Sequence, residues 1–111
     1  MLYPLSTLTV NLQAIKENYA QLIKHLHGVE CAAVVKANAY GLGIKKVSEA
    51  LYQAGCRCFF TAYLGEAIEL RSYFKDIDIH VFHGVQKGEE KLFWEHNIVP
   101  VINSLQQAET W

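Results

Sequence analysis

Short apolar runs alternate along the chain with longer segments in which apolar residues recur every three or four positions. This alternation is typical of successive βα units, in which each strand is followed by a helix. Five such units are predicted. Their strands are expected at residues 7–11, 31–36, 58–62, 77–83 and 98–102.

The first predicted helix has the most regular spacing. Its apolar face consists of Leu12, Ile15, Tyr19, Leu22, Ile23 and Leu26. Gly28 follows, where a residue able to adopt positive φ commonly ends a helix. Further helices are expected at residues 44–54, 64–74 and 88–96, and a fifth begins at Ser104, which has the spacing of a capping box with Gln107.

Most of the predicted strands are almost continuously apolar, which favours a parallel sheet covered by helices. An α/β chain of this kind forms either a (β/α)8 barrel or an open, doubly wound sheet. A barrel typically needs about 250 residues. Five units in 111 residues therefore cannot close one, and Pro100 suits the start or edge of its strand.

Composition and charge argue against several classes of protein. The chain is 51% hydrophobic and 19% charged, which indicates an ordered fold. A net charge of −1 without a basic run argues against nucleic acid as a partner. No apolar run approaches the roughly 18 residues of a membrane span, and the first residues do not resemble a signal peptide. We therefore expect a cytoplasmic protein that does not bind membranes.

The three cysteines are an odd number in a chain without a secretory signal. We interpret Cys31, Cys56 and Cys58 as reduced thiols that pack in the core. Cys56 and Cys58 together with His80 and His83 lack the usual spacings of zinc ligands. We therefore predict no metal site and interpret both histidines as hydrogen-bonded strand residues.

Lys36 stands at the end of the second predicted strand, after apolar residues 32–35. By position alone such a lysine more often marks the exit of a strand into solvent. At the tip of a barrel strand, however, a partly desolvated lysine supplies a neutral amine that forms a Schiff base with an aldehyde, as pyridoxal phosphate requires. Residues 38–43 predict a small loop whose free backbone N–H groups receive an anion at the start of the next helix.

The sequence Ala-Val-Val-Lys-Ala-Asn-Ala-Tyr-Gly-Leu-Gly at residues 33–43 resembles the cofactor-attachment motif of the alanine racemases. Every position except Leu42, where the family usually has histidine, fits the family pattern. Residues 9–12, 61–71 and 100–105 are similar to further segments of the same family. The resemblance therefore covers essentially the whole chain.

This resemblance implies that residues 1–111 are the N-terminal portion of a (β/α)8 barrel of TIM type, with about five βα units. Lys36 is implied to bind pyridoxal 5′-phosphate and to act as a catalytic base, and Tyr40 to donate a hydrogen bond to the cofactor phosphate. The implied activity is that of an isomerase, which interconverts L-alanine and D-alanine for the supply of peptidoglycan precursors.

Other parts of the implied active site have no counterpart in the sequence. In the family, the second base is a tyrosine from the C-terminal β domain of the other subunit of a homodimer, and the substrate arginine lies beyond the fifth strand. Arg57 and Arg71 are the only arginines, and we interpret them as surface or interhelical residues. We therefore expect the enzyme to continue beyond Trp111 and this chain to be inactive alone.

Two alternatives remain open at this point. A barrel protein that binds pyridoxal phosphate without racemase activity would share the fold, although such relatives usually carry a different sequence after the lysine. A non-catalytic remnant or interaction module would use the open edges of an incomplete barrel to pair with another chain. Coding sequence for further βα units and a β domain downstream of residue 111 would favour the racemase.

Overall fold

Four parallel strands form the centre of the computed structural model, which describes residue 3 and residues 5–111. The strands are β1 (Ala33–Val34), β2 (Cys58–Thr61), β3 (Asp78–Val81) and β4 (Val99–Pro100). Their order in the sheet is the order in the sequence. Each new unit is therefore added on the same side of the previous one, as in the winding of a barrel. The predicted α/β class with a parallel sheet is confirmed.

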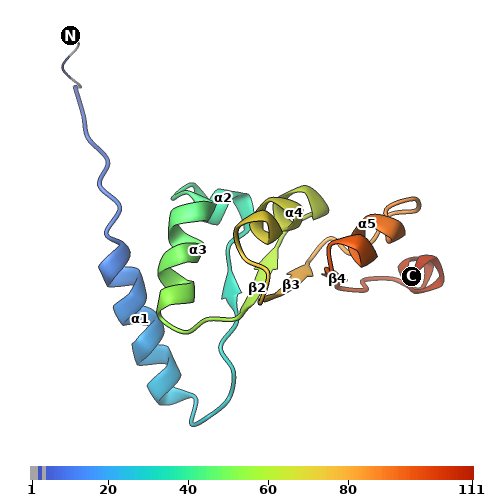
Figure 1. Ribbon diagram of the computed structural model, residues 1–111, viewed down its shortest axis with the longest axis horizontal. Coiled ribbons are helices and arrows are strands. Elements are labelled where there is room, and N and C mark those ends of the chain that lie inside the picture. Colours follow the sequence, from blue (N-terminus) through green and yellow to red (C-terminus); the bar gives the residue numbers. More distant parts are fainter. Residues whose placement is uncertain (1–2, 4) are drawn as a thin grey trace.

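The helices lie close to the predicted segments. They are α1 (Leu12–His25), α2 (Lys36–Tyr40), α3 (Ile44–Gln53), α4 (Leu64–Tyr73), α5 (Glu90–Glu95) and α6 (Leu105–Thr110). In Figure 1 the chain advances from α1 on the left to the C-terminal helix on the right, and every strand is followed by at least one helix. Among the described residues, none of these helices combines the length and hydropathy needed to cross a bilayer.

The predicted strand at residues 7–11 is wrong. This segment pairs with none of the four strands, and Figure 1 shows it leading away from the sheet. Leu8 is accordingly 81% exposed. An extended apolar segment becomes a strand only where its backbone groups find a neighbouring strand. Asn11 instead begins α1, because its side chain accepts a hydrogen bond from the Ala14 N–H at 3.0 Å.

The two faces of the sheet differ in burial. On the helix-covered face, Val35, Phe59, Ile79 and Val81 are all 0% exposed. Since side chains alternate between faces, the intervening residues lie on the opposite face. There Val34, Phe60 and His80 are adjacent in register, and Val34 is 39% exposed. We call this second surface the open face. The near-continuous apolar strands predict a sheet with helices on both faces, whereas the helices of the described residues cover only one face.

Candidate functional site

Lys36 lies at the C-terminal edge of the sheet, where the sequence predicts it, two residues after the end of β1 and at the start of α2. The preceding residue, Val35, donates its N–H to the carbonyl oxygen of Phe60 at 2.9 Å, which fixes the backbone before the lysine to β2. The Lys36 side chain is exposed, and its Nζ lies 5.8 Å from the centroid of the Phe82 ring. The amine is therefore accessible and held at the end of a rigid strand.

Aromatic rings line the open face beside Lys36. Phe82 stacks on Phe60 with a centroid distance of 5.0 Å, and Phe60 stacks on His80 at 4.6 Å. The three rings are only partly buried, so their surfaces face the space next to the lysine. His80 is a strand residue of β3, as the sequence predicts, and its carbonyl oxygen accepts the Thr61 hydroxyl at 3.5 Å. Its ring belongs to this stack. A flat apolar surface beside a primary amine suits a planar aromatic aldehyde.

The backbone after Lys36 forms one left-handed helical turn. Its residues are Ala37, Asn38, Ala39 and Tyr40, with φ from 51° to 56°. This conformation costs non-glycine residues roughly 1–2 kcal/mol each. The Ala39 N–H donates to the Val35 carbonyl at 3.0 Å and the Gly41 N–H to the Ala37 carbonyl at 2.9 Å, which closes the turn. Such strained backbone persists where the surroundings hold it, and it is concentrated at functional sites.

Glu66 and Asn38 connect this turn to its surroundings. Glu66 lies in the first turn of α4 and is only 7% exposed. Its Oε2 accepts the Asn38 N–H at 3.1 Å, and its Oε1 accepts the Ala62 N–H at 3.0 Å. The Asn38 Oδ1 accepts the Ile44 N–H at 2.9 Å at the start of α3. Sequence reasoning missed Glu66, whose signal is an acidic residue in the first turn of the helix after β2.

Most amides of the predicted anion-binding loop donate within the protein and are therefore not offered to an anion. The Leu42 N–H donates to the Ala39 carbonyl at 3.1 Å, and the Gly43 N–H to the Asn38 carbonyl at 2.9 Å. The Ile44 N–H, at the start of the helix, is bound by the Asn38 side chain. Within the turn, the Tyr40 side chain is 63% exposed to solvent.

Gln107 lies at the same C-terminal edge of the sheet as Lys36, beside the residues that follow β3. Its Nε2 donates to the His83 carbonyl at 2.8 Å, and the His83 ring lies 6.2 Å from that of Tyr63. The Ser104 Oγ accepts the Gln107 N–H at 3.1 Å, as predicted. The reciprocal bond of a capping box is displaced by one residue, since the Gln107 Oε1 accepts the N–H of Asn103 at 2.8 Å.

Arg71 has a structural role at the opposite edge of the sheet. Its guanidinium donates to the backbone carbonyls of Phe74, Lys75, Ile77, His96 and Asn97. These groups lie at the ends of α4 and α5 and just before β3. Burial lowers the pKa of Arg71 from its ordinary value. Arg57 lies over the Tyr52 ring at 3.6 Å, and the interpretation of both arginines as surface or interhelical residues agrees with these contacts.

The cysteines pack in or next to the core. Cys56 is 0% and Cys58 is 7% exposed, and Cys31 packs against the same cluster. Burial raises the pKa of the Cys58 thiol to about 11. The Cys56 thiol donates to the Cys58 carbonyl at 3.3 Å. These contacts support the predicted packing role for all three thiols.

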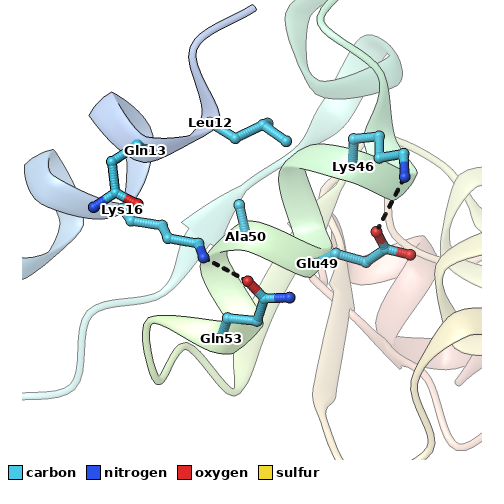
Figure 2. A pocket seen from close by; sticks show the side chains of 7 residues that line it. All are labelled: Leu12, Gln13, Lys16, Lys46, Glu49, Ala50 and Gln53. Atoms are coloured by element: carbon cyan, nitrogen blue, oxygen red, sulfur yellow. Dashed lines mark hydrogen bonds and ion pairs between the residues drawn. The ribbon is translucent and has the colours of Figure 1, made fainter.

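A polar pocket of about 290 Å³ lies away from Lys36, between α1 and α3, and Figure 2 shows its lining. Lys16 donates to the Gln53 Oε1 at 2.5 Å, and the Lys46 Nζ lies 3.9 Å from a carboxylate oxygen of Glu49. Both lysines thus have polar partners inside the pocket. The pocket lacks the strand-tip position and the aromatic surface that distinguish Lys36.

Residues 10–111 match the family described as "Alanine racemase, N-terminal domain". The chain belongs to this family. Among curated alanine racemases, that of Brucella ovis is 46% identical over 105 residues, which cover 94% of this chain and 26% of that protein. The catabolic alanine racemase of Rhizobium johnstonii is also 46% identical over 105 residues, covering 94% and 28%. This alanine racemase N-terminal domain therefore spans about a quarter of the length of these relatives.

Solved structures share the fold of this alanine racemase domain. The alanine racemase of Bartonella henselae with covalently bound pyridoxal phosphate has a TM-score of 0.88 and 42% identity, covering 92% of this chain and 29% of that one. A histidine racemase from Leuconostoc mesenteroides has a TM-score of 0.81 and 26% identity, covering 89% and 27%. The predicted partial barrel of TIM type is confirmed, with four paired strands in the described part of the chain rather than five.

Proposed function

We propose that this chain is the cofactor-holding N-terminal portion of an alanine racemase that depends on pyridoxal 5′-phosphate. The observation that carries the proposal is the placement of Lys36. Lys36 lies at the tip of a parallel strand, beside an aromatic surface, and is followed by a strained turn within the family motif. Alanine is the proposed substrate because the curated relatives described above are alanine racemases.

The residues around Lys36 fit the ring and the aldehyde of pyridoxal phosphate. A primary amine is the group that condenses with an aldehyde, and the rings of Phe60 and Phe82 offer a surface for a planar heterocycle. The phosphate group has fewer partners, since the amides at residues 42–44 donate within the protein. We propose the exposed phenol of Tyr40 as one donor to the phosphate, with further donors outside this turn.

Bound pyridoxal phosphate supplies an electron sink for the charge that develops at the substrate α-carbon. Lys36 would hold the cofactor covalently, and its released Nζ would carry a proton to or from one face of that carbon. Tyr40 would orient the phosphate end. Racemisation also needs a base on the other face. We place this base, with the remaining barrel units and a β domain, in the rest of a homodimeric enzyme, which we expect to be cytoplasmic.

The test is reductive trapping on this chain. The protein is incubated with pyridoxal phosphate, reduced with borohydride and digested, and the modified peptide is identified by mass spectrometry. Modification is expected at Lys36 and should disappear in Lys36→Ala. The matched control is Lys91→Ala, which removes an exposed lysine paired with Glu95 and should leave the modification unchanged. Modification spread over other lysines, or retained in Lys36→Ala, would contradict the site.

Activity provides a second, independent readout. The chain alone is expected to give no measurable interconversion of L-alanine and D-alanine, because one lysine cannot serve both faces of the α-carbon. Chiral chromatography after prolonged incubation with pyridoxal phosphate measures this directly. Robust turnover by residues 1–111 would refute the proposal that the second base lies elsewhere.

A further inference from the structure

We propose that Glu66 is a positioning residue, which holds the left-handed turn after Lys36 and so directs the lysine toward the open face. The inference rests on the proposed function of Lys36. Within the described part of the chain, Glu66 forms no hydrogen bond with Lys36; it acts through the Asn38 N–H. Its role is therefore distinct from those of Lys36 and Tyr40.

The geometry of the carboxylate supports this role. Its two oxygens bind two different backbone segments, the turn at Asn38 and the end of β2 at Ala62. The side chain is 7% exposed, so these bonds are shielded from competing water. One buried group thus fixes the distance between the turn and the neighbouring strand.

A carboxylate is the side chain that this position requires. It only accepts hydrogen bonds, and both groups that face it are N–H donors. Glu66 also lies in the first turn of α4, where the helix dipole favours a negative charge. In Glu66→Gln the amide would present its NH₂ group to one of the two N–H donors, and in Glu66→Asp the side chain would be one carbon shorter.

The backbone strain explains why the turn needs such support. Ala37 has φ of 51° and ψ of 50°, which alanine avoids outside a structure that imposes it. If the bond to Asn38 is lost, the turn is expected to relax toward negative φ and to carry Lys36 with it. Glycine adopts the left-handed region readily, so Ala37→Gly, at an exposed position, should compensate for a weakened support.

Hydrogen exchange tests the support without the cofactor. In Glu66→Gln, at least one of the amides of Asn38 and Ala62 is expected to exchange about tenfold faster, the factor that corresponds to one lost charge-assisted hydrogen bond. The matched control is Glu69→Gln, which changes an exposed carboxylate of the same helix. Unchanged protection of both Asn38 and Ala62 in Glu66→Gln overturns the proposal.

Reductive trapping then tests the consequence for the lysine. Glu66→Gln is expected to lower the yield at Lys36 roughly tenfold at limiting pyridoxal phosphate, and Ala37→Gly in the same chain should restore most of it. Because Ala37→Gly also relieves strain in the folded chain as a whole, the yield at Lys36 is compared in the folded fraction of each variant. Failure of the rescue, with both variants folded by circular dichroism, overturns the proposal.

A failure of Glu66→Gln to fold and a failure of the proposed function can each be distinguished from a failure of this inference. If Glu66→Gln does not fold, Glu66→Asp replaces it, with an intermediate loss at Lys36 expected and an unchanged yield overturning the proposal. If the unaltered chain is not modified at Lys36, the proposed function fails, while the exchange of the Asn38 and Ala62 amides still decides whether Glu66 holds the turn.

Discussion

Ser48 is a buried polar residue whose removal should stabilise the protein. It lies within α3 and is 0% exposed, and among the described residues its Oγ is the one buried side-chain oxygen or nitrogen without a hydrogen-bond partner. A buried hydroxyl without a hydrogen-bond partner from the protein is destabilising. Replacing it with alanine removes the polar atom and leaves the backbone and the Cβ in place.

The size of the effect follows from three contributions. An unsatisfied buried hydroxyl costs roughly 1–3 kcal/mol. Alanine is favoured over serine inside a helix by roughly 0.5 kcal/mol. The loss of the packing contacts of one atom offsets part of this gain, roughly 1 kcal/mol. Ser48→Ala is therefore expected to raise the free energy of unfolding by about 0.5–2.5 kcal/mol, or the Tm by roughly 2–11 °C in a domain of this size.

Urea denaturation followed by far-ultraviolet circular dichroism measures this change. The matched control is Ser72→Ala in α4, which removes an exposed serine bonded to the Glu69 carbonyl and should shift the free energy by no more than about 0.5 kcal/mol. If Ser48→Ala destabilises the protein, or behaves like the control, Ser48 has a partner in solution and the reasoning is refuted.

Two other predictions concern stability. Arg71→Lys is expected to lower the free energy of unfolding by about 2–4 kcal/mol, because one amine cannot bind five carbonyls. Reductive trapping at Lys36 in the folded fraction should be unchanged, because Arg71 lies at the opposite edge of the sheet; a parallel loss of trapping would contradict this separation. Burial raises the pKa of the Cys58 thiol from 9.0 to about 11, and burial likewise raises that of the Tyr19 phenol to about 12. Above about pH 9 the native protein keeps protons that the unfolded chain releases, so its stability should decrease with pH. The urea midpoint should therefore fall as the pH rises from about 9 toward 11. A constant midpoint would show that these two groups are accessible to solvent.

Much of the fold was predictable because its signals are local. The apolar spacing of α1 is set within the helix itself, and the predicted span agrees with Leu12–His25 to within a residue or two. The strand at residues 7–11 failed for the opposite reason. Its composition suits a strand, but strand formation depends on a neighbour that the segment's own sequence does not specify.

The residues of the candidate site likewise fall into those with local sequence signals and those that depend on distant parts of the chain. The position of Lys36 at the tip of β1 follows from the apolar run before it, so the sequence predicted it correctly. The handedness of the next turn did not follow, because alanine strongly prefers negative φ and nothing local indicates otherwise. The turn is fixed by Glu66, which is 28 positions beyond Asn38 in the sequence, and by the start of α3.

The direction of Lys36 is therefore a property of several βα units rather than of the eleven-residue motif. The motif contains left-handed residues that cost roughly 1–2 kcal/mol each when they are not glycine, and its internal hydrogen bonds are those of a single turn. An isolated turn of this length is not stable in water even when its dihedrals are favourable. The bonds from β2 and α4 must supply the difference. A sequence that matched the motif but lacked an acceptor at the position of Glu66 would keep the lysine and lose the geometry that makes it useful.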